Sequence, residues 1–280
     1  MRSLVLICLG LLGGLTAAQG QDKPPERVGR DTCLMCHELN NGFLTSPHSS
    51  LECEDCHGPG SEHVDSGGDT KFIRTPSAPD WPSTCLSCHT TGVGRLADFP
   101  VSPHGKNQVS CVDCHQVHGE KSVFKLLKEQ PTELCISCHK ATEATFRKPY
   151  HHPVLEGAME CTDCHDPHSE PSQSYRRLDT FAQYGCTSCH ADKKGPFVFP
   201  HPAVEEGGCV TCHEPMGSFN PKMLIRSNVY QLCLECHTQT PGVASSQPPA
   251  FHDIRSPRYR NCTICHREIH GSNVSPLFLR

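Results

Sequence analysis

The chain has 280 residues, a formal net charge of −5 and a pI near 6.4, which excludes a nucleic-acid-binding protein that relies on bulk positive charge. Leu, Ile, Val and Phe number only 56, aromatic residues are 6%, and 21 Cys and 20 His stand against them. Side-chain burial alone does not offset the ordering entropy of such a chain, so another component must fill its interior.

The first twenty residues predict a secretory signal peptide. Met1 and Arg2 form a short basic start, residues 4–15 are an apolar run, and small-residue cleavage candidates follow at residues 16–20. An uncleaved membrane anchor is the alternative, but the run is shorter than the about 20 residues that span a bilayer. Cleavage would remove Cys8 and leave 20 Cys in an exported chain.

The twenty remaining cysteines form ten Cys-x-x-Cys-His motifs. Zinc ribbons and redox dithiols also use Cys-x-x-Cys, but they do not need His after every second cysteine. Cys-x-x-Cys-His is the attachment motif of c-type haem, in which two thioethers hold the porphyrin and the adjacent His becomes the proximal iron ligand. We therefore predict ten covalently attached haem c groups. The thioether cysteines are Cys33, Cys36, Cys53, Cys56, Cys85, Cys88, Cys111, Cys114, Cys135, Cys138, Cys161, Cys164, Cys186, Cys189, Cys209, Cys212, Cys233, Cys236, Cys262 and Cys265, and the proximal histidines are His37, His57, His89, His115, His139, His165, His190, His213, His237 and His266.

Ten further histidines equal the number of predicted haems. The first cysteines of alternate motifs recur at intervals of 52, 50, 51 and 47 residues, which indicates five tandem two-haem repeats. We expect one decahaem domain over residues 21–280, with units at approximately 33–84, 85–134, 135–185, 186–232 and 233–280. Spare histidines in each unit predict six-coordinate irons without an open site, and the candidate distal ligands are His48, His63, His104, His118, His151, His152, His168, His201, Met216, His252 and His270.

Unit four departs from this pattern. Met216 stands where units two and three carry histidine, and unit three holds a spare in the His151–His152 pair. Either Met216 is the axial ligand of the haem on Cys209 and Cys212, which would raise its potential, or one of the two histidines serves that haem and Met216 merely packs. An open catalytic iron is a third interpretation.

The fold expected from these features is a multihaem cytochrome c of mostly irregular coil with short α-helices and little or no β-structure. The 24 Pro and 22 Gly interrupt long elements, and short helices are expected within residues 132–146 and 229–238. The macrocycles would supply the apolar interior as an elongated haem wire, so folding should depend on haem attachment.

The chain resembles the MtrA/DmsE/PioA family of decahaem cytochromes. The resemblance rests on the ten motifs and on four segments: Cys-His-Gly-Pro-Gly-Ser-Glu-His at 56–63, His-His-Pro-Val-Leu-Glu-Gly at 151–157, Gly-Ser-Phe-Asn-Pro-Lys-Met-Leu at 217–224 and Ile-His-Gly-Ser-Asn at 269–273. Members usually have Cys-His-x-Pro-His-Gly-Ser where this chain has Met216, which leaves that haem's ligation open.

The resemblance implies an exported electron carrier, periplasmic or associated with the outer membrane. Many members form a haem wire inside a β-barrel porin and exchange electrons with other cytochromes, outward or inward. A soluble periplasmic carrier that feeds a terminal reductase is one alternative. A multihaem reductase enzyme is another, but such enzymes often carry a variant motif and none of the ten deviates. We expect neither nucleic-acid binding nor a membrane span of the chain itself.

Overall fold

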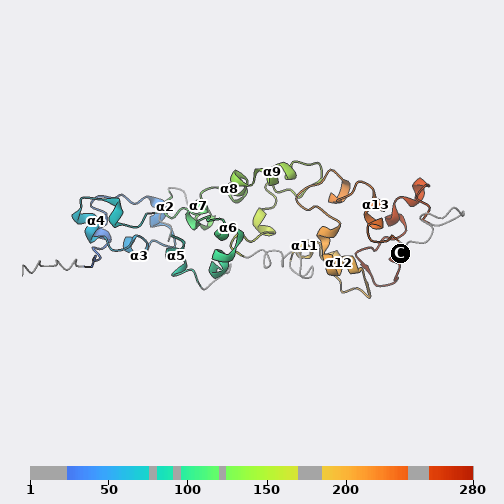
Figure 1. Ribbon diagram of the computed structural model, residues 1–280, viewed down its shortest axis with the longest axis horizontal. Coiled ribbons are helices and arrows are strands. Elements are labelled where there is room, and N and C mark those ends of the chain that lie inside the picture. The colour runs from blue at the N-terminus through green and yellow to red at the C-terminus, as the bar shows by residue number, and fades with distance from the viewer. Residues whose placement is uncertain are drawn as a thin grey trace, which may run out of the picture. The chain divides into compact units, whose positions relative to one another are not determined.

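The computed structural model describes residues 24–75, 81–90, 96–119, 124–169, 185–238 and 252–279 (Figure 1). The predicted signal peptide lies outside these residues. The chain divides into two compact units, the first comprising Met1–His37 and Glu52–Arg74 and the second Glu38–Leu51 and Thr75–Arg280. This division cuts through the first predicted repeat, because the segment that carries His48 packs with the second unit.

All helices of the described part are short. Proline occupies the first turn of four of them, α5, α6, α8 and α12, where its missing N–H is not needed, and few run beyond two turns. The α-helices are α1 Arg30–Cys33, α2 Asn41–Leu44, α3 Cys53–His57, α4 Ser61–Asp65, α5 Trp81–Leu86, α6 Pro103–Lys106, α7 Cys111–Cys114, α8 Pro131–Cys138, α9 Lys140–Phe146, α11 Cys186–Cys189, α12 Pro202–Gly207 and α13 Val229–Leu234. Several further motifs begin with a 3-10 turn, as at Cys161–Asp163, Cys209–Thr211 and Cys262–Ile264.

The motifs themselves close a helical turn. The backbone N–H of the motif histidine donates to the carbonyl of the first cysteine, for example from His115 to Cys111 at 2.8 Å. Residues four apart lie on one face of a helix, so this turn presents the cysteine and the imidazole on the same side. At His139 the backbone leaves the helical region, and the helix expected over residues 132–146 is therefore two helices, α8 and α9. Helix α13 likewise ends at Leu234, before the expected 238.

Regular β-structure is limited to one small antiparallel pair in the described residues. Strand β1, Phe199–Pro200, pairs with β2, Gly271–Ser272, in the register Phe199↔Ser272 and Pro200↔Gly271. An isolated bridge joins Tyr150 to Ser218 in the same antiparallel sense. The expectation of short helices, coil and little sheet is therefore confirmed.

Within the described residues, the polypeptide buries few large hydrophobic side chains. In the described ranges, the buried large hydrophobic side chains are only Phe43, Phe99, Phe146 and Val154. Serines are buried alongside them, and each makes backbone hydrogen bonds. Among the described helices, none has the length and hydrophobicity needed to cross a membrane. Because so few large hydrophobic side chains are buried in the described residues, the interior needs a non-protein component, as the composition indicates.

A buried carboxylate organises the first unit. Glu54 lies inside the second motif, is only 5% exposed, and accepts backbone N–H groups of Val28 at 2.8 Å, Gly29 at 2.9 Å and Gly60 at 2.9 Å. Burial by itself would raise the pKa of Glu54, but these three donors and Arg27 outweigh it and hold the pKa below its ordinary value. The motif Cys53–His57 is thereby fixed to the chain's N-terminal segment.

Candidate haem-binding sites

Histidine rings face one another in pairs throughout the described chain. Eight contacts each join a motif histidine to a spare histidine, with ring centroids 5.9–6.3 Å apart. The pairs, motif histidine first, are His37 with His63, His89 with His48, His115 with His168, His139 with His104, His190 with His152, His213 with His270, His237 with His201, and His266 with His252.

The spacing of these rings fits a metal ion between them. An imidazole nitrogen binds a metal at about 2.0–2.1 Å and lies about 1.1 Å from its ring centre, so two trans imidazoles have centres about 6 Å apart. The described residues contain no cluster of three or more His, Cys, Asp or Glu side chains that could hold a metal. Two protein ligands on opposite sides, with the remaining positions supplied by a porphyrin, match both observations.

Backbone carbonyls orient many of these rings. In each case Nδ1–H donates to a carbonyl, which leaves Nε2 for a metal and fixes the ring plane. The bonds run from His57 to Arg74 at 2.7 Å, His63 to Asp69 at 3.1 Å, His104 to Pro167 at 3.0 Å, His115 to Lys125 at 2.9 Å, His152 to Pro215 at 2.7 Å, His213 to Lys222 at 2.8 Å and His266 to Leu277 at 2.6 Å.

Strained turns supply some of these carbonyls, and sequence reasoning missed them. Lys125 and Lys222 each have a φ of 59°, a conformation that costs about 1–3 kcal/mol for a residue other than glycine. At the second turn, Ser218 Oγ and Asn220 Nδ2 both donate to the carbonyl of Leu224, at 2.7 and 2.8 Å. The Gly-Ser-x-Asn-Pro segment is therefore the signal that could have found the turn.

The first cysteines of the two motifs in each unit lie close enough to shift each other's pKa. Interaction with Cys85 lowers the pKa of Cys111 to about 7, and interaction with Cys186 lowers the pKa of Cys209 to about 6. These thiols would become thioethers, so their proximity places the two attachment points of a unit near each other. The five pairs are Cys33 with Cys53, Cys85 with Cys111, Cys135 with Cys161, Cys186 with Cys209, and Cys233 with Cys262.

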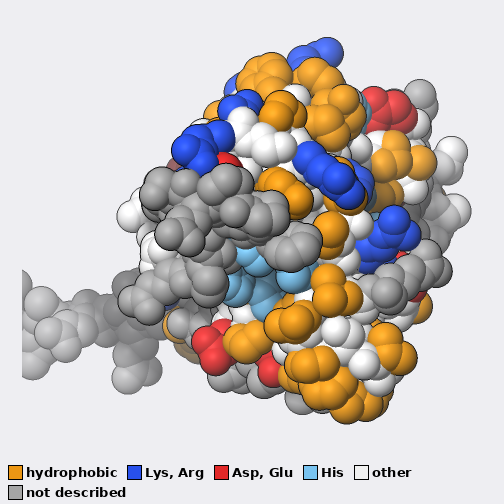
Figure 2. Space-filling model, turned by 90° about the vertical axis from the view of Figure 1, so that its right-hand side faces the viewer, with side chains coloured by type: hydrophobic (Ala, Val, Ile, Leu, Met, Phe, Trp, Pro, Cys, Tyr) orange, Lys and Arg blue, Asp and Glu red, His pale blue; other side chains and the backbone are white. Residues whose placement is uncertain are grey.

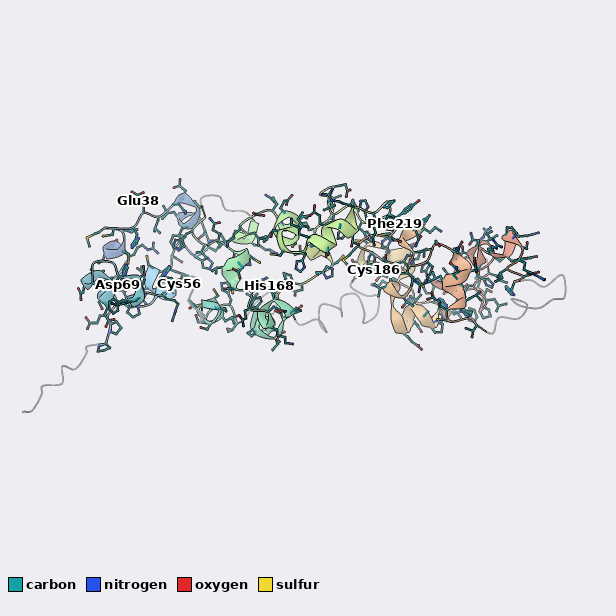
Figure 3. All side chains as sticks on the ribbon, turned by 45° about the horizontal axis from the view of Figure 1, so that its top comes forward. Glu38, Cys56, Asp69, His168, Cys186 and Phe219 are labelled. Atoms are coloured by element: carbon teal, nitrogen blue, oxygen red, sulfur yellow. The ribbon has the colours of Figure 1, made fainter. Side chains whose placement is uncertain are left out.

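Consecutive units also approach one another through their motifs. The pKa of Cys164 is raised first by burial and then by the nearby Cys186 of the next unit. Cys114 and Cys212 have pKa values raised mainly by burial, with Cys138 and Cys236 of the following units also contributing. The attachment points from Cys85 onward therefore succeed one another in chain order. In Figure 3 the labelled Cys186 lies further along the second unit than His168, and Phe219 lies close to Cys186.

Two histidines outside the motifs, His118 and His151, contact groups other than a motif histidine. The ring of His118 lies 5.3 Å from that of Phe43, and the amide of Asn40 donates to the His118 carbonyl. His151 uses both ring nitrogens within the protein, Nδ1 toward the carbonyl of Lys148 at 2.5 Å and Nε2 toward Glu156 Oε1 at 3.0 Å. The bond to Glu156 raises the pKa of His151.

The surroundings of His213 correct the interpretation of unit four. Its ring faces His270 at 6.3 Å, with the two planes inclined by 18°. The two sequence interpretations placed either Met216 or one histidine of the His151–His152 pair opposite the motif of Cys209. The structure places His270 there instead. The reason is that post-motif histidines reach across to the preceding unit, which the spacing of a single unit does not show.

Comparisons with known proteins support these features. Family profiles match three parts of the chain, "Cytochrome c-type protein NrfB-like" over residues 53–138, "Cytochrome c3" over 103–177 and "Doubled CXXCH motif" over 201–242. The multihaem cytochrome MtrA of Shewanella baltica is 35% identical over 281 aligned residues, which cover 91% of this chain and 81% of that protein. The chain belongs to the MtrA family. The resemblance noted from the sequence is thus confirmed.

A second relative shares a shorter stretch with this MtrA family member. The polyhaem cytochrome OmcB of Geobacter sulfurreducens, matched in two strains, is 32% identical over 113 residues. That alignment covers 33% of the chain and 14% of OmcB. With the family and the motif profiles established, the chain is a c-type cytochrome that carries covalent haem and transfers electrons, and it is not an enzyme.

Proposed function

We propose that the chain is a decahaem cytochrome that conducts electrons through a chain of low-spin haems across the outer membrane, inside a β-barrel porin partner. The observation that carries the proposal is the set of eight opposed histidine pairs, each between a motif histidine and a spare one. A ferric or ferrous iron with two strong axial ligands is six-coordinate and has no position for substrate. Such an iron gains and loses one electron.

The order of the cysteine contacts supports conduction along the chain. Within a unit the first cysteines lie close to one another, and from unit two onward the second motif lies near the first motif of the next unit. Since thioethers attach at the porphyrin edge, neighbouring cysteines bring neighbouring macrocycle edges together. Electron transfer slows steeply with edge separation, so this succession favours stepwise transfer through units two to five.

The end of the second unit offers a place for electron exchange. Figure 2 shows histidine side chains in a recess of this face, bordered by hydrophobic side chains and by Lys and Arg. Beside the β1–β2 pair, Val198 and Val274 are 66% and 77% exposed, and the Val198 N–H donates to the side chain of Asn273. Exposed apolar side chains next to a redox centre suit contact with a partner protein, which we take to be the porin or a second cytochrome.

The predicted signal peptide supports export to the periplasm. In that compartment the chain would receive its haems and bind the porin. The described helices include no membrane span, so a conductor of this kind needs a protein sheath to pass the bilayer.

The haem content is tested on the full mature holoprotein. Intact mass and a haemochrome assay should give ten haems per chain, and electron paramagnetic resonance should show low-spin ferric iron. Fewer haems, or a dominant high-spin signal, would contradict the proposal.

Conduction is tested in vesicles that contain the cytochrome with its co-purified barrel and a trapped redox dye. External reductant should bleach the dye only when both proteins are present. If the cytochrome instead purifies alone and reduces soluble partners at full rate, the soluble periplasmic carrier is the correct function.

A further inference from the structure

His165 differs from the paired motif histidines. Its backbone closes the usual turn onto Cys161 at 2.9 Å, but no histidine ring of the described residues stands opposite it. The other histidine of the His151–His152 pair, His151, uses both ring nitrogens for Lys148 and Glu156. The haem predicted at Cys161 and Cys164 therefore needs a distal ligand of another kind.

The repeat has a fixed way of delivering two distal ligands at once. His104, from the spacer of unit two, donates to the carbonyl of Pro167 and faces His139 of the next unit. The residue after Pro167 is His168, which faces His115 of the preceding unit. One crossing of two segments thus serves two haems in opposite directions.

The crossing near the C-terminus follows the same plan. His201 lies beside the backbone of Ile269 and faces His237 of the next unit. The residue after Ile269 is His270, which faces His213 of the preceding unit. We call residues 199–201 with 269–272 the C-terminal crossing.

The middle crossing consists of residues 150–152 and 215–218. It has the same arrangement as the other two crossings, except that its second ligand position is not a histidine. His152 donates to the carbonyl of Pro215 at 2.7 Å and faces His190 of the next unit. The residue after Pro215 is Met216. By the rule of the other two crossings, this position serves the second motif of the preceding unit, which is the motif of His165.

The backbone shows that the two crossings are in the same register. In the C-terminal crossing, Phe199 pairs with Ser272, two residues before His201 and two after His270. In the middle crossing, the pair is Tyr150 with Ser218, two residues before His152 and two after Met216.

The glycines after the two ligand positions also agree. Gly217 and Gly271 follow Met216 and His270 directly, and their φ angles are 150° and 144°. Met216 therefore occupies the backbone position that His270 has in the C-terminal crossing.

From this register we infer that Met216 is the distal ligand of the haem at Cys161 and Cys164, making it a His165/Met216 site in the middle of the chain. The Met216 side chain is 40% exposed in the polypeptide, so no protein core accounts for it. A thioether sulfur is an established axial ligand in c-type cytochromes and raises the potential relative to histidine. The sixth haem would then hold electrons more strongly than the bis-histidine haems on either side.

The inference deepens the proposed function and rests on it. The test is near-infrared magnetic circular dichroism of the ferric holoprotein, in which methionine-ligated haem gives its own charge-transfer band. We expect a band equal to one haem in ten, lost in Met216→His with the haem count unchanged. In a redox titration of Met216→His, one haem should move to lower potential.

Two other methionines provide matched controls. Met159 lies two residues before Cys161, and Met35 is 76% exposed within the first motif. Both Met159→Leu and Met35→Leu should keep the band, whereas Met216→Leu should replace it by a high-spin signal from one haem in ten.

The inference is overturned if ten haems are present and the wild type has no such band, or if the band disappears in Met159→Leu instead of Met216→His. A haem count well below ten would contradict the proposed decahaem function itself, so the two failures are distinguishable.

Discussion

The middle crossing and the C-terminal crossing share a backbone arrangement and differ in the ligand they present. Both pair a residue two positions before a spacer histidine with a serine two positions after the ligand, and both place a glycine of positive φ between ligand and serine. One presents Met216 and the other His270. The backbone therefore fixes where a ligand stands, and the side chain alone sets the chemistry at that iron.

The largest effect should come from preventing haem attachment to the whole chain, which removes the haems at both crossings. Chain expressed without the attachment machinery should be unfolded, because its few buried hydrophobic side chains cannot replace the macrocycles. Far-UV circular dichroism and limited proteolysis measure this directly. A compact, protease-resistant haem-free chain would show that the crossings form without their cofactors.

The next effect exchanges the ligands between the crossings. His270→Met should convert the haem opposite His213 into a second histidine–methionine site and double the methionine band relative to total haem. Adding Met216→His should return the band to the intensity of one haem. The ring of His151 is hydrogen-bonded to Lys148 and Glu156, so His151→Ala is the control and should not alter the band. A His270→Met protein with only a new high-spin signal would mean that the crossings are not equivalent.

Replacing Gly217 or Gly271 by alanine should destabilise the protein to different extents. A Cβ on Gly217 would lie 2.2 Å from the backbone oxygen of Thr145, whereas one on Gly271 would lie 2.1 Å from the ring of Phe197, which can rotate. The positive φ alone costs about 1–3 kcal/mol, so both variants should lower the urea midpoint, and Gly217→Ala should lower it more.

Gly157 isolates the backbone contribution to this difference. It has a φ of 76°, and a Cβ at this position would meet no heavy atom within 4 Å, so Gly157→Ala adds strain without a clash. Its urea midpoint should fall less than that of Gly217→Ala. Equal midpoints for all three variants would show that the close approach at Thr145 does not matter.

The smallest effect concerns the buried serines that follow the glycines. Ser218 Oγ donates to the Leu224 carbonyl and accepts from the Asn220 N–H, while Ser272 Oγ accepts from two backbone N–H groups. Alanine at either serine should cost about 1 kcal/mol in the free energy of unfolding. The exposed Ser227→Ala should leave the urea midpoint unchanged, and a similar null result for Ser218→Ala would remove its role in holding the turn.

The sequence alone determined the local chemistry of this protein. Cysteine and histidine within five consecutive residues suffice to attach a porphyrin and offer one axial ligand, so the motifs and the haem type follow from spacing, whereas the family follows from the resemblance of four longer segments. The 24 Pro and 22 Gly likewise predicted short helices, coil and little sheet, and the described elements agree.

The tertiary structure decided how ligands are shared between units. His152 and Pro215, or His201 and Ile269, are more than 60 residues apart in sequence, and only the register of their crossing brings them together. The carbonyl of Lys222 that orients His213 depends on a strained turn, and the Gly-Ser-x-Asn-Pro segment marks that turn without showing which ring it orients. A covalent motif is fixed by neighbours along the chain, whereas a distal ligand is fixed by strand register, and for this reason the place of Met216 could be inferred only from the fold.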